Sequence, residues 1–168
     1  NFALPPMSEF EKQITSRTKG IVIINPNNPT GYLYSQQELE SLANIVKKYD
    51  LYLYSDEVYR RYCYDGVRHY SVMNLQGIEQ NTILFDSMSK RYSECGIRVG
   101  ALISRNQEIL TASLKFGMAR LCPPALGQIA AEASLDTTEE YFQKVYNEYI
   151  KRRDFMVRTL NQMPGVYC

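Results

Sequence analysis

A lysine that follows two serines is the residue of this sequence best suited to covalent chemistry. Lys90 ends the segment Ser-Met-Ser-Lys at residues 87–90, and Arg98 lies eight positions further along. The amine of a lysine is a nucleophile once it is deprotonated, and it can anchor an aldehyde as a Schiff base. A guanidinium close behind it is suited to binding a phosphate. The spacing therefore predicts a site for an aldehyde cofactor that also carries a phosphate.

Two polar segments that precede this lysine could complete such a site. Residues 25–31 read Asn-Pro-Asn-Asn-Pro-Thr-Gly around Asn28, and residues 55–59 read Ser-Asp-Glu-Val-Tyr with Asp56 and Tyr59. Each has an ordinary interpretation when it is taken alone, because asparagine is common in turns and strand-end charges usually face water. Their occurrence together and in this order favours one shared site.

The elements that must position these residues follow from the hydrophobic pattern. Apolar runs predict strands at 21–24, 51–55, 82–85 and 99–103, the first of them buried on both faces. Helical spacing of apolar residues up to Tyr49 predicts a helix between the first two strands, which should then be parallel. About ten residues separate the last two strands. That is too few for a comfortable helical crossover, so the fourth strand is expected to run antiparallel.

The candidate residues share a position relative to these strands. Asn28, Asp56 and the segment 87–90 each follow the carboxyl end of a predicted strand. In open α/β sheets, ligands bind in the crevice outside that edge. Polar groups from three distant parts of the sequence are therefore expected to converge there.

Helices are predicted to dominate the rest of the chain. They are expected at 107–116, from Pro123 to about 135, and from Thr137 to the Pro-Gly pair at 164–165. The fold class is therefore α/β, with helices on both faces of the sheet. Residues 1–136 are expected to form part of a sheet domain, and 137–168 a long helix that leads toward a second domain. Three S/T-x-x-E patterns predict N-terminal capping boxes: Ser8 with Glu11, Ser35 with Glu38, and Thr137 with Glu140.

Composition narrows the class of protein. Hydrophobic residues make up 45% and charged residues 22% of 168, as in a soluble globular domain. A net charge of +1 and the lack of a long apolar run give no reason to expect nucleic acid or a membrane as partner. The four cysteines have no paired spacing, which is typical of reduced thiols in a cytoplasmic protein. The single histidine, His69, argues against a metal site or a Ser-His-Asp triad and is expected on the surface.

Taken together, the motifs resemble those of the class I/II aminotransferases, which are fold-type I pyridoxal phosphate enzymes. The N-P-x-N-P-T-G turn, the S-D-E-V-Y strand end and the S-x-S-K…G-x-R-x-G segment all match, and the resemblance covers essentially the whole chain. Arg91 after the lysine and Ile97 before the arginine are less typical of the family. The resemblance implies part of a large domain with a mostly parallel sheet, pyridoxal 5′-phosphate as cofactor, and a homodimer. It also implies transfer of an amino group between an L-amino acid and a 2-oxo acid.

The resemblance also implies a role for each candidate residue. Lys90 would form the Schiff base with the cofactor aldehyde and would later move the substrate's Cα proton. Asp56 would keep the pyridine nitrogen protonated, which makes the ring a better electron sink. Asn28 and Tyr59 would hydrogen-bond the ring oxygen O3′. Ser87 and Arg98 would hold the phosphate, with Ser89 as an added phosphate contact.

Two alternatives to transamination share these motifs. One is a cofactor-dependent C–S β-lyase or decarboxylase, because groups outside this sequence decide the fate of the substrate once its Cα proton is lost. The other is a non-enzymatic, cofactor-sensing domain of a transcription regulator. Family members carry a ring-stacking aromatic residue upstream and a carboxylate-binding arginine downstream of the part matched here. Residues 1–168 alone are therefore expected not to turn over amino acids, and they do not define the substrate.

Overall fold

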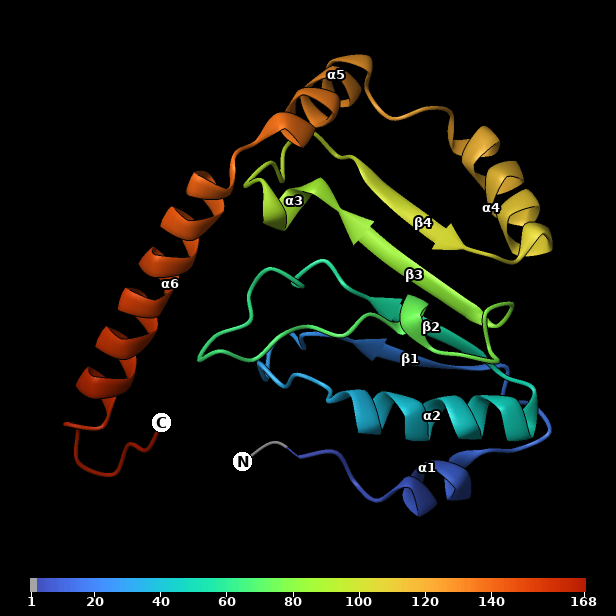
Figure 1. Cartoon of the computed structure of the whole chain (residues 1–168), viewed down its shortest axis with the longest axis horizontal. Coiled ribbons are helices and arrows are strands. Elements are labelled where there is room, and N and C mark those ends of the chain that lie inside the picture. Colours follow the sequence, from blue (N-terminus) through green and yellow to red (C-terminus); the bar gives the residue numbers. More distant parts are fainter. Residues whose placement is uncertain (1–2) are drawn as a thin grey trace. The chain divides into compact units, whose positions relative to one another are not determined.

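A four-stranded sheet forms the centre of the computed structural model, which describes residues 3–168. The strands are neighbours in their sequence order: β1 (Gly20–Ile24), β2 (Tyr52–Asp56), β3 (Thr82–Ser87) and β4 (Gly100–Ser104). The first three are parallel, and β4 runs antiparallel to β3. The predicted strands and the antiparallel direction of the fourth are thus confirmed (Figure 1).

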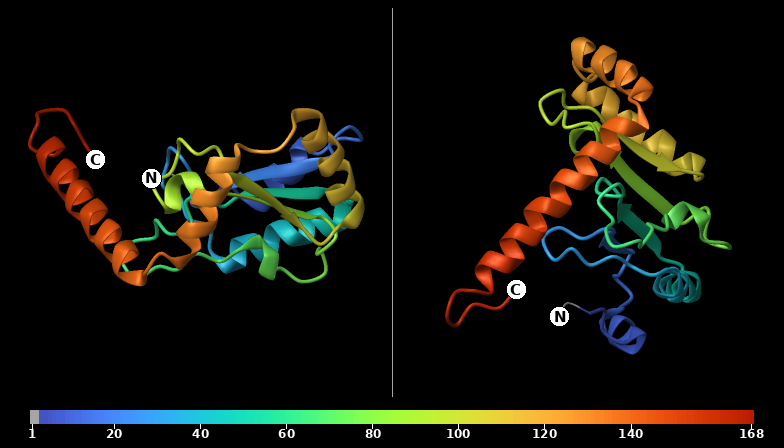
Figure 2. Two further views of the ribbon diagram at one scale, coloured as in Figure 1. Left: turned by 90° about the horizontal axis from the view of Figure 1, so that it is seen from above. Right: turned by 60° about the vertical axis from the view of Figure 1, so that its left-hand side comes forward.

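Helices lie on both sides of this sheet. In the left view of Figure 2, α2 lies below the sheet and α4 above it. Figure 1 shows α2 alongside β1 and β2, and α4 beside β4. The helices before the last one are α1 (Met7–Gln13), α2 (Gln36–Tyr49), α3 (Met88–Arg91), α4 (Gln107–Arg120) and α5 (Ala125–Ala133), with a short 3₁₀ turn η1 (Val72–Asn74).

The hydrophobic core lies between α2 and the sheet. Leu39, Leu42 and Val46 of α2 are fully buried, and they share one cluster with Ile23 and Leu53 of the strands. The helix begins at the predicted capping box: the Ser35 hydroxyl accepts from the amide of Glu38 at 3.2 Å. In return, the Glu38 carboxylate accepts from the amide of Ser35 at 2.8 Å. Capping and packing together hold α2 against β1 and β2.

The other two predicted capping boxes are wrong. Ser8 lies inside α1, whose N-cap is Pro6, and no side chain caps this helix. Thr137 ends a 3₁₀ turn, so the N-cap of the last helix is Thr138, one residue later. The side chain of Thr138 accepts no hydrogen bond from the backbone amides of the helix. In both cases the sequence pattern is present, but the predicted capping residue does not occupy the N-cap position of the helix.

The far face of β1 also differs from the prediction. Val22 is 72% exposed, whereas Ile23 is buried against α2. Within residues 3–168, the sheet face that carries Val22 is therefore incompletely covered, although the apolar run predicted burial on both sides.

Two compact units divide the chain, one ending at Glu132 and one from Ala133 to Cys168. The second consists of the 3₁₀ turn η2 (Ser134–Asp136) and the long helix α6 (Glu139–Leu160), of which no residue is buried. In the part of the chain that the structure describes, no helix combines the length and hydrophobicity needed to cross a membrane.

Candidate active site

Hydrogen bonds between neighbouring strands align the ends that carry the candidate residues. Asp56 is in register with Ile24 on one side and with Phe85 on the other. Just beyond this level, the amide of Asn25 donates to the Asp56 carbonyl at 2.8 Å, and that of Glu57 donates to the Phe85 carbonyl at 3.0 Å. The segments that follow β1, β2 and β3 therefore leave the sheet side by side.

Hydrogen bonds of a buried asparagine hold the turn after β1 in place. Asn25 is fully buried, and its side chain donates to the carbonyl of Tyr70 at 3.3 Å and accepts from the amide of Tyr34 at 3.1 Å. The peptide bonds before both prolines of this turn are cis. Asn28 is left exposed at the tip, where its side-chain nitrogen donates to the Tyr59 hydroxyl at 3.3 Å.

Lys90 lies over the same tyrosine. Its Nζ is 5.7 Å from the centre of the Tyr59 ring. The lysine belongs to α3, a single helical turn that starts where Ser87 ends β3. The Ser87 hydroxyl caps this turn by accepting from the amide of Ser89 at 3.1 Å, and it donates to the Ser89 hydroxyl at 2.8 Å. The structure thus brings together Asn28 with Tyr59 and Lys90, and Ser87 with Ser89.

Asp56 and Arg98 make contacts within their own loops. Oδ1 of Asp56 accepts from the amide of Val58 at 3.1 Å, and Nη1 of Arg98 donates to the Cys95 carbonyl at 2.7 Å. Arg98 has a φ of 57°, in the left-handed region, which costs a non-glycine residue about 1–2 kcal/mol. Its neighbour Val99 accepts from the Ser87 hydroxyl at 3.3 Å, which places the Arg98 backbone next to the two serines.

A buried carboxylate supports the loop after β2, and sequence reasoning missed it. Glu57 is 1% exposed and accepts from the amide of Val72 at 2.9 Å and from the Ser55 hydroxyl at 3.3 Å. Burial raises the pKa of Glu57, and the hydrogen bonds that it accepts partly oppose that rise. Its position inside the Ser-Asp-Glu-Val-Tyr motif was the signal that could have identified it.

His69 faces this carboxylate, so its predicted surface position is wrong. The histidine side chain is only 10% exposed, and its Nε2 lies 3.5 Å from Oε2 of Glu57. Burial, together with the charge of Arg60, lowers the pKa of His69 to about 4. Glu57 and His69 are therefore both shifted toward their uncharged forms.

A second group behind the site consists of one carboxylate and two arginines. Asp86, the residue before Ser87, is 16% exposed. Its Oδ1 lies 2.6 Å from Nη1 of Arg60, and its Oδ2 accepts from Nη2 of Arg91 at 2.8 Å. Arg60 follows Tyr59 and Arg91 follows Lys90 in the sequence, so one aspartate connects both segments.

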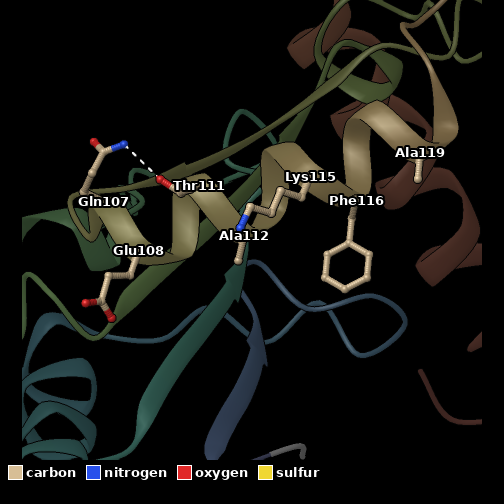
Figure 3. A pocket seen from close by; sticks show the side chains of 7 residues that line it. All are labelled: Gln107, Glu108, Thr111, Ala112, Lys115, Phe116 and Ala119. Atoms are coloured by element: carbon tan, nitrogen blue, oxygen red, sulfur yellow. Dashed lines mark hydrogen bonds between the residues drawn. The ribbon is translucent and has the colours of Figure 1, made fainter.

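The cavity along α4 contains none of the candidate residues. It measures about 590 Å³, and Figure 3 shows the exposed ring of Phe116 at its lining. Among residues 3–168, no three histidine, cysteine or acidic side chains gather as a metal site. The candidate residues lie instead at the strand edge around Tyr59 and Lys90.

The fold and this edge together define a class of protein. A mostly parallel α/β sheet that gathers an amine, a phenol, an amide and hydroxyls at the carboxyl ends of its strands is typical of α/β domains that bind a small polar ligand.

Comparison with known proteins makes this assignment specific. The family described as aminotransferase class I and II matches residues 5–168. An aromatic-amino-acid aminotransferase of Thermococcus litoralis and an aspartate aminotransferase of Pyrococcus abyssi are each 33% identical over 94% of this chain and 41% of their own length. The crystal structure of an aromatic aminotransferase from Pyrococcus horikoshii superposes with a TM-score of 0.89 at 32% identity, over 96% of this chain and 44% of that one. The chain belongs to the class I and II aminotransferase family, and it spans about two fifths of the length of these relatives.

Proposed function

We propose that the full protein containing this chain is a pyridoxal phosphate-dependent aminotransferase that transfers an amino group between an L-amino acid and a 2-oxo acid. Family membership supports this proposal, and the named relatives are aminotransferases. The observation that carries it at the level of the site is the position of the Lys90 amine over the Tyr59 ring, whose hydroxyl accepts from Asn28.

The donor set at the strand edge fits the polar groups of pyridoxal phosphate. An amine is available for the aldehyde, a carboxylate for the ring nitrogen, and a phenol with an amide for the ring oxygen. When bound, the cofactor supplies a ring that accepts electrons from the substrate carbon. The remaining donors suit a phosphate: the hydroxyls of Ser87 and Ser89 and the guanidinium of Arg98.

Each residue then has a defined task. Lys90 would hold the cofactor through its amine, and the same amine would carry the proton that the substrate Cα loses. Asp56 would keep the ring nitrogen protonated, because an ionised carboxylate favours a cation beside it. Tyr59 and Asn28 would hold the ring oxygen O3′ by hydrogen bonds. Arg98, which donates to the Cys95 carbonyl, would hold the phosphate by a stronger, charge-assisted bond.

Reduction of the cofactor link tests the anchor. The full natural protein is incubated with pyridoxal phosphate, treated with borohydride and digested, and the modified lysine is identified by mass spectrometry. We expect the pyridoxyl group on Lys90, and we expect it to be lost in Lys90→Ala. Lys12→Ala, which removes an exposed lysine of α1, is the matched control and should bind normally. Modification of other lysines to the same extent would contradict the proposed anchor.

Product analysis separates the proposed reaction from the two alternatives. We expect an amino acid and a 2-oxo acid to exchange an amino group with 1:1 stoichiometry. Pyruvate and ammonia formed from cystathionine would indicate the lyase, and carbon dioxide the decarboxylase. Cofactor binding without any turnover would indicate a sensing domain. Cytoplasmic activity is expected and is tested by cell fractionation.

We also propose a homodimer in which residues 1–136 belong to the large domain and 137–168 lead to a small domain. Large apolar side chains exposed after β4 support it: Leu114, Phe116, Met118, Leu121, Leu126 and Ile129. Phe116 is 80% exposed and lines the cavity of Figure 3. Apolar patches of this kind usually mark an interface. Sedimentation of the full protein should give a dimer that Phe116→Lys weakens and Val67→Lys, at an exposed loop position, does not.

A further inference from the structure

The element that carries Lys90 cannot fix its own position. Helix α3 has four residues, and none of them is buried. A single helical turn is unstable in isolation, because nucleation costs more than one hydrogen bond returns. Contacts made by the residues next to Lys90 must therefore determine where its amine lies.

Arg91 provides the first of these contacts. Its guanidinium donates to Oδ2 of Asp86 at 2.8 Å, and both side chains are largely buried, at 17% and 16% exposed. A charge-assisted bond between two largely buried groups is stronger and better ordered than a surface ion pair. It ties the end of α3 back to β3, five residues upstream.

The same carboxylate holds the segment that carries Tyr59. Oδ1 of Asp86 lies 2.6 Å from Nη1 of Arg60. Arg60 belongs to a turn closed by backbone bonds from its own amide to the Glu57 carbonyl and from the amide of Tyr62 to the Tyr59 carbonyl. Each oxygen of Asp86 thus has its own arginine, and each arginine is the sequence neighbour of a candidate site residue.

A further bond joins the same two segments on the backbone. The Tyr62 hydroxyl donates to the Lys90 carbonyl at 2.6 Å. The turn 57–62 and helix α3 are therefore held together at two points, one through Asp86 and one through Tyr62. The Tyr59 ring and the Lys90 amine, one on each of these segments, are 5.7 Å apart.

We propose that Asp86 is a positioning residue, which sets the distance between the Tyr59 ring and the Lys90 amine by holding Arg60 and Arg91 on its two oxygens. Asp86 acts from behind the site: it adjoins Ser87 in β3, and neighbouring residues of a strand point to opposite faces. The functional consequence rests on the proposed cofactor role of Lys90, whereas the mechanical consequence does not.

Hydrogen exchange on the cofactor-free natural protein tests the mechanical part. In Asp86→Asn, one oxygen remains but the charge and one acceptor are lost, so residues 58–62 and 88–92 should both exchange faster, by about tenfold for a coupling of ordinary size. In Arg91→Gln the Asp86–Arg60 pair survives, so only 88–92 should speed up. The control Glu148→Gln removes an exposed ion pair between Glu148 and Arg152 on α6, and it should change the exchange rate of neither segment.

Cofactor binding tests the functional part. Asp86→Asn should weaken pyridoxal phosphate binding by about tenfold, and it should alter the circular dichroism of the bound cofactor, which reports its orientation. A purely structural aspartate would lower stability and leave that spectrum unchanged. Glu148→Gln should bind as the unsubstituted protein does.

The outcomes separate this inference from the proposed function. Unchanged exchange in both segments of Asp86→Asn would overturn the positioning role, whether or not the protein binds the cofactor. If Asp86→Asn does not fold, exchange in Arg91→Gln decides: acceleration at 88–92 alone supports the role, and no change refutes it. Failure of the unsubstituted protein to bind pyridoxal phosphate would refute the proposed function and leave the exchange result standing.

Discussion

Removal of the buried Glu57 carboxylate should be among the most damaging single changes in the described chain. Glu57→Ala would leave the amide of Val72, itself fully buried, without its acceptor, and it would also orphan the Ser55 hydroxyl. An unsatisfied buried donor costs about 1–3 kcal/mol. The truncation also opens a cavity, for which a further cost of the same order is usual. We therefore expect the free energy of unfolding to fall by about 3–5 kcal/mol.

Glu57→Gln separates the shape of this side chain from its charge. The amide keeps one oxygen for the Val72 amide and fills nearly the same volume. Because burial already disfavours the charged form of Glu57, neutralising it should cost little, about 1 kcal/mol. The difference between the Ala and Gln variants then measures the hydrogen bonds and the packing.

Equilibrium urea unfolding at pH 7 measures these differences, followed by far-ultraviolet circular dichroism and by the fluorescence of the 14 tyrosines. Glu40→Ala is the matched control, since Glu40 is exposed on α2 and its carboxylate accepts from the exposed side chain of Gln36 at 2.7 Å. It should change the free energy of unfolding by less than about 0.5 kcal/mol. A loss below about 1 kcal/mol for Glu57→Ala, or equal losses for the Ala and Gln variants, would refute this reasoning.

Three further predictions concern stability. His69 has a pKa of about 4 in the folded chain against an ordinary 6.5, so the unfolded chain binds more protons between these values and stability falls as the pH drops through them. His69→Asn should flatten that dependence by up to about 3 kcal/mol, and an unchanged pH profile of unfolding would contradict it. Leu42→Ala in the core should cost about 2–5 kcal/mol in urea unfolding, whereas Val67→Ala, at an exposed loop position outside the proposed interface, should cost far less. Ser35→Ala should cost about 1 kcal/mol by the loss of its cap, and a neutral result would show that packing alone fixes the start of α2.

The strands and their directions were predictable because they depend on local pattern and connection length. Four apolar runs marked the strands, and the short connection before β4 indicated its antiparallel direction. The proximity of Asn28, Tyr59 and Lys90 was predictable for a related reason, because the carboxyl ends of parallel strands lie at one edge. The Asn28–Tyr59 bond and the position of Lys90 over Tyr59 agree with that expectation.

The errors arise where a contact depends on residues distant in the sequence. His69 stands in a polar, tyrosine-rich stretch that is typical of a surface, but the fold buries it beside Glu57, twelve positions earlier. The pattern of Val22 predicted burial, yet within residues 3–168 its face of the sheet is incompletely covered. Capping boxes failed at Ser8 and Thr137 because a four-residue pattern does not say at which residue a helix starts.

Strand alternation explains why the candidate residues Asp56 and Ser87 each have a supporting acidic neighbour. Asp56 and Glu57 are consecutive, as are Asp86 and Ser87, and consecutive residues at a strand end point to opposite faces. One member of each pair is a candidate site residue, and the other is largely buried and binds a neighbouring loop: Glu57 through Val72, and Asp86 through Arg60 and Arg91. An acidic residue next to a candidate residue at a strand end therefore predicts a buried contact that holds a neighbouring loop. This pattern can be recognised in the sequence once the strand is known. It also explains why a substitution at Glu57 or Asp86 should disturb the site without touching a ligand.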